Sequence, residues 1–572
     1  MADKRPDKIK INIPSIADFP EVPSSWGGML WNETGSWRFA APLFSERPSP
    51  CSTACPLRNN IPQIMHLVKE KDAKGAWELL AWEDPLPAIL GRVCPAFCTM
   101  ECNRGRYDDP VGIREVERRL GDDFLNAPSP VQKRDKTDKG VGIIGSGPAG
   151  LSAAYFLALL GHNVTIFERE KVPGGIPRLS IPDYRLPKSV VEKTAAAIIK
   201  MGVELRLGVE AGAEIKKNFD ALFVSPGAAV SMALGIEGEN LPGVRSGTEL
   251  LKGVKAGSVK EVSRKIAVIG GGNTALDAAR TILRLGGEPV IIYRRTTGEM
   301  PAFADEIKEA VEENIPMEFL KAPVKVSTLN GGRLSVTLID MELVEPDESG
   351  RKRPVPVKGT ERTIEIDGLV TALGEKIEPS FMGEIGGDKI VFIGGDAAGG
   401  DRTVAHAAAS GKRGAVEIDA RLLGKKVDLS ADRPVSFKAY FNGIENPEAE
   451  AEPVSFEEIN TDYFPKSERR RPKGLTPEVR TKDFSEIGTT LAPADAAYEA
   501  SRCFVCGTCI DCKTCESFCP DFTVRAVKAA GALGFGVEID YTYCKGCGIC
   551  VRECPRGMFI MVDEETIERL GR

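Results

Sequence analysis

Two glycine-rich turns of the same kind constrain the fold of this chain more than any other feature. Each turn follows a short apolar run, at residues 141–144 and 266–269, and precedes a helical stretch. The positions that carry the GxGxxG/A pattern are Gly145, Gly147, Gly150, Gly270, Gly272 and Ala275. In a βαβ unit such glycines allow a tight turn and let the backbone approach a pyrophosphate at the helix N-terminus. The chain is therefore expected to be an α/β protein with two Rossmann-like dinucleotide-binding domains.

The residues that end the second strand of each unit indicate different dinucleotides. In the first unit Glu168 lies 23 positions after the first glycine, where a carboxylate can accept a hydrogen bond from a ribose 2′-hydroxyl. The corresponding position in the second unit is Tyr293, followed by Arg294 and Arg295. Guanidinium groups match a phosphate, so this unit is expected to bind NADP(H); NAD(H) is the alternative if the arginines are only a solvated strand end. Two dinucleotides in one chain favour hydride transfer between a nicotinamide and a flavin, which needs no acid or base from a side chain.

Cysteine spacing near the C-terminal end predicts iron–sulfur clusters. The chain has 15 cysteines, and the last eight form the run CxxCxxCxxxCP twice, over residues 509–520 and 544–555. In bacterial two-cluster ferredoxins the fourth cysteine of each run ligates the other cluster. One 4Fe–4S cluster is therefore expected on Cys509, Cys512, Cys515 and Cys554, and the other on Cys544, Cys547, Cys550 and Cys519. Zinc is the alternative metal for CxxC pairs, but it rarely needs this run twice.

The composition argues against several classes of protein. The formal net charge is −7, and no basic tract exceeds the three arginines of residues 469–471, which argues against nucleic-acid binding. No apolar run has the length needed to span a bilayer, and residues 1–5 lead into no apolar signal segment, so a cytoplasmic location is expected. The three histidines, His66, His162 and His406, stand in no motif with a nucleophile or carboxylate. No catalytic side chain is therefore expected.

Further motifs carry a resemblance to one family. The chain contains, in this order, Gly174-Gly-Ile-Pro-Arg-Leu-Ser-Ile-Pro-Asp-Tyr-Arg-Leu-Pro, then Glu299-Met-Pro-Ala, then Val391-Phe-Ile-Gly-Gly-Asp396. Together with the first glycine turn, these motifs resemble the small subunit of glutamate synthase and its relatives. The relatives include the N-terminal part of dihydropyrimidine dehydrogenase and the large subunit of the NADH-dependent ferredoxin:NADP transhydrogenase. The resemblance covers roughly residues 40–505. It implies that Asp396 contacts the ribityl chain of FAD; an ordinary β-turn aspartate is the alternative.

The resemblance also implies a domain order in which the nicotinamide domain is inserted into the FAD domain. We expect an N-terminal helical iron–sulfur domain over residues 1–125, with helical sequence over 61–80. The FAD-binding domain is expected over 126–262 and 366–425, and the NAD(P)-binding domain over 263–365. Residues 426–502 are rich in Pro and Glu and are expected to be a wrapping linker, followed by an α+β bacterial-type ferredoxin domain over 503–572.

Seven further cysteines fall one short of the eight ligands that two more clusters need. They are Cys51, Cys55, Cys94, Cys98, Cys102, Cys503 and Cys506. In the resembling family the N-terminal clusters also use a leading CxxC, which is absent here, and a downstream Glu or Gln. The resemblance implies one cluster on Cys51, Cys102, Cys503 and Cys506, and another on Cys55, Cys94, Cys98 and Glu117. The alternatives are a free or labile pair at Cys503 and Cys506, and an ordinary solvated helix glutamate at Glu117.

These expectations describe an electron-transfer oxidoreductase with FAD, NADP(H) and four 4Fe–4S clusters. Electrons would pass between NADPH, FAD, the Glu117 cluster, the mixed-terminus cluster and the ferredoxin pair, in a direction that the sequence does not set. The partner would be a 2-oxoacid:ferredoxin oxidoreductase, a sulfite reductase, a formate dehydrogenase or free ferredoxin, which makes the chain part of a hetero-oligomer. A glutamate synthase small subunit is the alternative, and the appended ferredoxin module counts against it. A scaffold with structural clusters would leave both glycine motifs unexplained.

Overall fold

The computed structural model describes residues 33–34, 38–211, 213–228, 230–346, 350–377, 390–430, 433–445, 452–528, 531 and 533–571. The start of the chain, on which the expectation of no signal segment depends, lies outside these residues. The chain forms two compact units. The terminal unit comprises Met1–Pro50, Glu450–Lys466 and Phe504–Arg572, and the main unit comprises Cys51–Ala449 and Ser467–Cys503.

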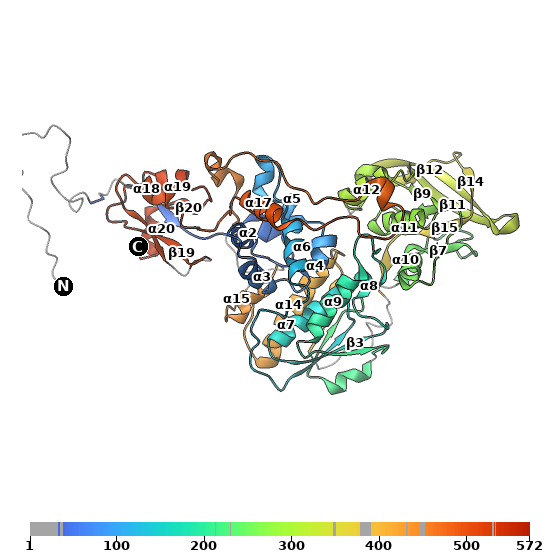
Figure 1. Ribbon diagram of the computed structural model, residues 1–572, viewed down its shortest axis with the longest axis horizontal. Coiled ribbons are helices and arrows are strands. Elements are labelled where there is room, and N and C mark those ends of the chain that lie inside the picture. Colours follow the sequence, from blue (N-terminus) through green and yellow to red (C-terminus); the bar gives the residue numbers. More distant parts are fainter. Residues whose placement is uncertain are drawn as a thin grey trace, which may run out of the picture. The chain divides into compact units, whose positions relative to one another are not determined.

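The first sheet of the main unit holds the first glycine turn. Its strand order is β17-β5-β2-β3-β4, and all neighbouring strands run parallel. The strands are β2 (Gly140–Ile144), β3 (Asn163–Glu168), β4 (Glu204–Leu207), β5 (Ala221–Val224) and β17 (Ile390–Ile393). The accompanying helices are α7 (Pro148–Leu159), α8 (Gly175–Leu179), α9 (Lys188–Ile199) and α14 (Val404–Leu423) (Figure 1). The expected strand–turn–helix–strand unit is thus present.

Helix α7 is buried along almost its whole length. It packs against β2 and β3 on one side and against α14 on the other, which explains why its sequence is apolar around the full circumference. The close approach of the two helices requires Gly411, because a Cβ there would lie 2.2 Å from the carbonyl oxygen of Ala149. The helix that follows the first glycine turn is therefore the centre of this domain.

The second parallel sheet is inserted between β5 and β17, as expected for the nucleotide domain. Its strand order is β10-β9-β8-β15-β7. The strands are β7 (Val244–Ser246), β8 (Lys265–Ile269), β9 (Glu288–Tyr293), β10 (Met317–Phe319) and β15 (Gly368–Thr371). Its helices are α10 (Gly247–Ala256), α11 (Asn273–Arg284) and α12 (Ala304–Glu312). The sheet extends past the expected range 263–365 at both ends, because β15 forms ladders with both β8 and β7.

An antiparallel sheet accompanies the second sheet. In it β12 pairs with β11, β13 and β14. The strands are β11 (Lys321–Thr328), β12 (Leu334–Pro346), β13 (Lys352–Pro356) and β14 (Arg362–Ile366). A short antiparallel pair joins β6 (Val230–Ser231) to β16 (Glu375–Lys376).

The N-terminal part of the main unit is helical, as expected. Its helices are α1 (Pro50–Ala54), α2 (Ile61–Lys69), α3 (Ala73–Ala81), α4 (Pro87–Val93), α5 (Phe97–Met100) and α6 (Ile113–Asp123). The helical sequence expected over 61–80 is divided into α2 and α3. Lys71 has a left-handed backbone (φ 64°), and the side chain of Asp72 accepts a hydrogen bond from the Gly75 amide at 2.9 Å. The Asp72 cap starts a new helix there.

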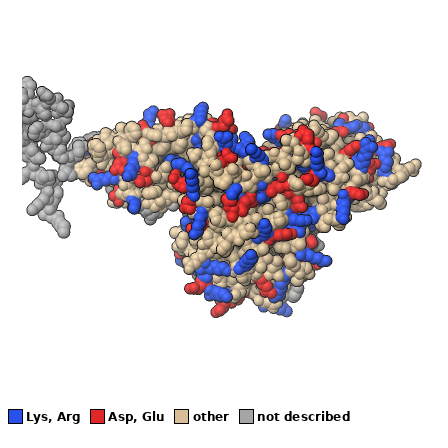
Figure 2. Space-filling model, viewed as in Figure 1, with Lys and Arg blue, Asp and Glu red and all other residues tan. Residues whose placement is uncertain are grey.

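Residues 467–503, which we call the strap, run over the main unit with little regular structure. Its helices are α16 (Pro477–Arg480) and α17 (Pro493–Ser501), and α17 packs on α2 and α6. Strap side chains form partly buried ion pairs with the main unit: Arg480 pairs with α12, and Glu486 pairs with α4 and α6. Figure 2 shows basic and acidic side chains interspersed over the face in view, without a large area of one sign. Residues 467–503 thus contact several elements of the main unit rather than forming a core of their own.

The terminal unit contains the cysteine runs. Its elements are α18 (Thr514–Ser517), β18 (Val524–Lys528), β19 (Phe535–Ile539), α19 (Ile549–Glu553), β20 (Phe559–Asp563) and α20 (Glu564–Arg569). Strand β1 (Ala40–Phe44) pairs antiparallel with β20, so this stretch belongs here rather than to the expected N-terminal domain 1–125. Pairing satisfies the backbone edge that β20 would otherwise leave open. None of the described helices is long and apolar enough to cross a membrane.

Candidate cofactor sites

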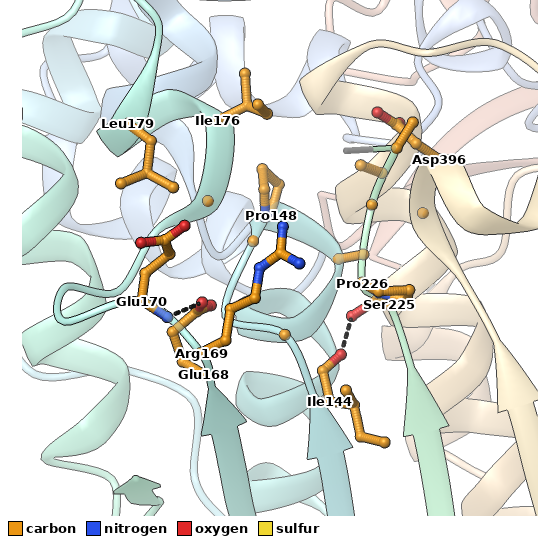
Figure 3. Close-up of a pocket in the computed structure, with 18 of the residues that line it drawn as sticks. Ile144, Pro148, Glu168, Arg169, Glu170, Ile176, Leu179, Ser225, Pro226 and Asp396 are labelled. Atoms are coloured by element: carbon orange, nitrogen blue, oxygen red, sulfur yellow. Dashed lines mark hydrogen bonds between the residues drawn. The ribbon is translucent and has the colours of Figure 1, made fainter. Parts of the chain in front are cut away.

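A cavity of about 240 Å³ opens beside the first glycine turn. It lies at the carboxyl ends of β2, β3 and β5, where Ile144, Glu168 and Ser225 line it, and Pro148 at the start of α7 lines it as well (Figure 3). The carboxyl end of a parallel sheet, next to a helix N-terminus, is where α/β folds bind dinucleotides. The structure thus places the first glycine motif at a cavity of the expected kind.

Glu168 lines this cavity, and the glycine turn holds its carboxylate in place. One oxygen accepts hydrogen bonds from the Ser146 amide at 2.9 Å and from the Ser146 hydroxyl at 2.6 Å. The other oxygen accepts from the Glu170 amide at 2.9 Å, as drawn in Figure 3. The carboxylate is buried and orientated, and one of its roughly four lone-pair sites remains for a ribose hydroxyl. Ser146 was not identified from the sequence, because its role depends on the pairing of β2 with β3.

Asp396 lines the same cavity, from the 3-10 helix η7 (Gly395–Ala398) that precedes α14. Burial raises the pKa of Asp396 above its ordinary value, and the charge of Arg402 opposes the shift. Lining residues that the sequence did not single out include Arg169, Thr248 and Lys252. Thr248 and Lys252 stand one helical turn apart on α10, an element of the second sheet, so only the tertiary structure brings them to the cavity.

The glycines of the first turn differ in what a side chain would meet. A Cβ at Gly150 would lie 1.9 Å from the carbonyl oxygen of Gly145, and one at Gly145 would lie 2.4 Å from the carbonyl oxygen of Ser225. A Cβ at Gly147 would meet nothing within 4 Å. Gly145 and Gly150 are therefore needed by the fold itself. Gly147 leaves open a space that the protein does not use, as a pyrophosphate cradle would.

The segment Gly174–Pro187, singled out by the sequence, connects this cavity to the second sheet. We call it the clamp segment. Its Ile176, Pro177 and Leu179 line the cavity. Lys255 of α10 donates hydrogen bonds to the carbonyl oxygens of Pro177 and Leu186 at 3.1 Å each, and also to that of Ile181. A helix of one domain thereby holds a wall of the other domain's cavity.

The C-terminal end of the clamp segment is anchored to the second sheet by charge. The ring of Tyr184 lies 3.9 Å from the guanidinium of Arg284 and 4.8 Å from that of Arg280. Arg185 pairs with Asp277 at 2.7 Å and with Glu306 at 2.8 Å. These contacts fix the two dinucleotide-binding parts against each other.

The second glycine turn joins β8 to α11. Gly270 has a positive φ of 143°, and a Cβ there would lie 2.3 Å from the carbonyl oxygen of Ala372. Gly272 has only Pro301 near its Cβ position, at 3.9 Å, so it again faces open space. Ala275, at the third position of the pattern, is fully buried in α11. The ring of Tyr293 packs over the turn, within 2.6 Å of a Cβ at Gly271.

The two arginines after β9 differ in environment. Arg295 is buried and donates from Nε to the carbonyl oxygen of Lys352 at 2.8 Å, so it supports β13. Arg294 is exposed and has no hydrogen bond or ion pair with any residue that the structure describes. Of the expected pair, Arg294 is the guanidinium available to a phosphate.

Cys55, Cys94 and Cys98 surround Glu117 of α6. Burial raises the pKa of each thiol, and the neighbouring charge of Glu117 raises it further, to about 12 for Cys55 and Cys94. Asn59 donates to Glu117 Oε2 at 3.5 Å. Burial raises the pKa of Glu117, and the neighbouring charge of the buried Asp84, which the sequence did not single out, raises it further. The structure therefore brings these three thiols and the Glu117 carboxyl into one buried neighbourhood.

Cys51, Cys102 and Cys503 pack in the same hydrophobic core as this group. Cys503 follows α17 at the end of the strap, so the C-terminal part of the chain does fold back onto the N-terminal helices. This core also contains Ala149, Ala153 and Phe156 of α7. Cys506 belongs to the terminal unit.

In the terminal unit the cysteines line two separate cavities. One is lined by Cys509, Cys512, Cys515 and Cys554, and the other by Cys519, Cys544, Cys547 and Cys550. Each cavity takes three cysteines from one run and one from the other, which is the crossed arrangement expected from the spacing. Among the described residues, no three His, Cys, Asp or Glu side chains are arranged to bind a single metal ion.

Family models match the chain in three consecutive segments. Residues 45–128 match dihydropyrimidine dehydrogenase domain II, 4Fe-4S cluster, and residues 139–387 match pyridine nucleotide-disulphide oxidoreductase. Residues 508–558 match the 4Fe-4S dicluster domain. Each match covers the segment in which the structure gathers the corresponding cysteines or glycine turns.

Curated relatives extend these matches. The NADP(+)-dependent formate dehydrogenase subunit beta of Moorella thermoacetica is 32% identical, over 80% of this chain and 70% of its own length. The glutamate synthase [NADPH] small chain of Escherichia coli is 31% identical, over 64% of this chain and 87% of its own length. The chain belongs to the glutamate synthase small-chain family. The NADPH-Fe(3+) oxidoreductase subunit beta of Geobacter sulfurreducens is 37% identical over 58% of this chain, and the chain spans about half of that relative, 52%.

Membership of this family confirms the resemblance and the fold class stated from the sequence. The protein is an oxidoreductase with an FAD/NADP-binding fold, a preceding iron–sulfur domain and a following 4Fe–4S dicluster domain. The cofactors named by these matches fit the donor sets described above: open glycine turns for dinucleotides, and groups of thiols for clusters.

Proposed function

We propose that this protein transfers electrons between NADPH and a partner redox protein by way of FAD and four 4Fe–4S clusters. When bound, FAD supplies exchange of hydride for single electrons, and the clusters supply single-electron carriage. The chain contributes no acid or base to this chemistry: His162 donates to or accepts from Thr137 and Asp419 at 2.8 and 2.9 Å, in a buried structural network.

One observation carries the proposal. The helix α7 that follows the FAD glycine turn shares a single hydrophobic core with Cys51, Cys55 and Cys98. A packed core holds its residues in fixed relative positions. Packing of the proposed flavin site and the first proposed iron–sulfur ligands around one core supports electron transfer between them without a large motion.

The residues that would hold the dinucleotides follow from the two turns. For FAD we assign Gly145, Gly147 and Gly150 to the pyrophosphate, Glu168 to the adenosine ribose and Asp396 to the ribityl chain. For NADPH we assign Gly270, Gly272 and Ala275 to the pyrophosphate and Arg294 to the 2′-phosphate, with Arg295 as a buried support. An exposed guanidinium without a partner favours NADPH over NADH.

Four clusters are proposed for the sixteen ligands. Two lie in the crossed cavities of the terminal unit. A third uses Cys55, Cys94, Cys98 and Glu117. The fourth uses Cys51, Cys102, Cys503 and Cys506, the last pair being supplied from beyond α17.

The partner is proposed to be a redox enzyme or a ferredoxin, because relatives are named as subunits of a formate dehydrogenase and of an NADPH-Fe(3+) oxidoreductase. We also propose a hetero-oligomer in the cytoplasm, and the naming of these relatives as subunits supports the hetero-oligomer. The match with the glutamate synthase [NADPH] small chain, 31% identical over 87% of that chain, favours supply of electrons to a glutamate-forming large subunit as the second candidate. Glutamine-dependent NADPH oxidation with such a subunit would distinguish it.

The proposal is tested by anaerobic titration of the purified, iron-replete protein with NADPH and, separately, with NADH. Flavin bleaching is followed by absorbance and cluster reduction by EPR, with iron and flavin assayed. We expect about sixteen iron atoms per FAD and more complete reduction at low NADPH than at low NADH. About eight iron atoms per FAD would mean that only the terminal unit binds clusters, and equal response to both nucleotides would remove the assignment of Arg294.

A further inference from the structure

Arg104 connects the loop after Cys102 to the end of the strap, where Cys503 lies. It lies two residues after Cys102, in the 3-10 helix η3 (Asn103–Arg106). Its Nη1 donates to the carbonyl oxygen of Arg502 at 2.6 Å, and Arg502 directly precedes Cys503. Its side chain is 2% exposed. A buried guanidinium thus donates a hydrogen bond to the backbone carbonyl of the residue before a proposed cluster ligand.

Arg502 makes the reciprocal contact with the loop after Cys102. Its Nη2 donates to the carbonyl oxygen of Asp109 at 2.7 Å and to Asp108 Oδ1 at 3.1 Å. Its Nη1 donates to Glu499 at 3.0 Å, and Glu499 in turn accepts from the Gly112 amide at 2.9 Å. The side chain of Arg502 is 1% exposed.

Asp108 joins the two arginines. Its oxygens accept from Arg104 Nε at 2.8 Å and Nη2 at 2.5 Å, and also from the Ser467 amide at 3.0 Å, at the start of the strap. Two guanidiniums and the carboxylates of Asp108 and Glu499 compensate one another, so the buried network is neutral. Such a network is stable only when all its members are present.

We propose that Arg104, Asp108 and Arg502 are positioning residues that hold Cys503 beside Cys51 and Cys102, so that one cluster can be assembled from two ends of the chain. This inference rests on the cluster assignment under Proposed function. The leading CxxC that family members carry on the N-terminal side is absent from this chain. A pair supplied from the far end must be held by contacts of its own, and this network is what the structure provides.

The test compares Arg104→Gln, Cys503→Ser and the double variant with the full-length wild type, purified with iron and sulfide under anaerobic conditions. We expect each single variant to hold about twelve iron atoms per FAD against about sixteen in the wild type, with loss of one and the same EPR signal. The double variant should lose no more iron than either single variant, because both changes remove the same cluster. Arg104→Lys should restore part of the signal, because an ammonium can still reach the carbonyl oxygen of Arg502 but cannot also bridge Asp108.

Two measurements distinguish the positioning role of Arg104 from the cluster assignment on which it rests. Arg119→Gln, which removes an arginine paired with Asp123 on α6, is the control and should keep all the iron. In the cluster-free protein, Arg104→Gln should speed proteolytic cleavage after residue 502 while FAD remains bound. A wild type with well under sixteen iron atoms would refute the cluster assignment itself. Full iron and an unchanged EPR spectrum in Arg104→Gln, or loss of FAD together with the iron, would overturn the positioning role.

Discussion

Arg480 of the strap donates from Nε to Glu313 at 2.9 Å, beyond the end of α12, and the side chain of Glu313 is completely buried. Glu313 also accepts from Arg280 and Arg284, the two arginines that lie against the ring of Tyr184. The strap backbone adds a hydrogen bond from the Ile487 amide to the Tyr184 carbonyl oxygen at 2.9 Å. The strap, the clamp segment and the nucleotide domain therefore meet at one carboxylate.

This arrangement predicts a large effect for Glu313→Gln. The substitution would leave Arg280, Arg284 and Arg480 without their shared buried anion, which costs about 3–5 kcal/mol. We expect faster limited proteolysis within residues 467–503 and a lower thermal midpoint. Glu288→Gln, which removes an exposed partner of Arg264, is the control and should change little. Equal behaviour of the two variants would contradict the anchoring role.

Arg294 predicts nucleotide preference. Arg294→Ala should raise KM for NADPH by about 10- to 100-fold, because a hydrogen bond to a charged phosphate contributes about 1.5–3 kcal/mol. KM for NADH should stay the same, since NADH lacks the 2′-phosphate. Steady-state diaphorase assays with a dye acceptor measure both values, with Arg264→Ala as a control at an exposed position of the same domain. A parallel change for both nucleotides would exclude the phosphate contact.

The first glycine turn predicts two distinct failures. Gly147→Ala points a methyl group into open space, so the protein should fold and hold its clusters but bind FAD poorly. Gly150→Ala places the methyl group against the Gly145 carbonyl oxygen, so it should destabilise the domain itself. Iron content, flavin content and thermal melting distinguish the two. Normal FAD binding by Gly147→Ala would remove the pyrophosphate assignment.

Lys255 predicts a pH dependence. Burial lowers its pKa to about 8, from an ordinary value of 10.5. Between these values the unfolded chain binds a proton that the native protein has released, so rising pH favours the native state. Between pH 8 and 9.5 this group should raise the free energy of unfolding by about 2 kcal/mol, and the Lys255→Met variant should lack this increase. The urea midpoint of flavin release is measured by fluorescence at pH 7.5 and 9.5. It should rise more with pH for the wild type than for Lys255→Met, and equal rises would refute the role of Lys255.

Glu117 predicts a ligand exchange. Glu117→Cys should retain about sixteen iron atoms per FAD but change the EPR spectrum of one cluster, because thiolate is a softer ligand than carboxylate. Glu117→Ala should lose iron or give an altered cluster. Glu78→Ala, at an exposed position of α3, is the control. An unchanged spectrum in Glu117→Cys would mean that Glu117 is not a ligand.

Much of the site was predictable because the relevant chemistry is local. The glycine turns, the acidic end of β3 and the cysteine runs place their groups through backbone geometry over a few residues, so spacing alone indicated two dinucleotide sites and the crossed cavities. The return of the segment before Cys503 to the N-terminal helices was also expected, because the resemblance implies that Cys503 and Cys506 replace the missing CxxC. The insertion of one domain in the other came from the resemblance.

Other features depended on contacts between distant segments, which spacing does not encode. The sequence does not distinguish the adjacent residues Arg294 and Arg295. In the structure Arg295 is buried against β13, and Arg294 is exposed. Strand β1 joined the terminal unit because β20 presented an open backbone edge, and α2 ended early because Asp72 caps a new helix. Lys252, Ser146 and the strap's pairing with Glu313 emerged only from packing. The sequence by itself determined where the glycine turns and the cysteine runs lie. The tertiary structure decided which charged side chains are buried or paired and which are exposed, because burial and pairing are properties of the folded whole.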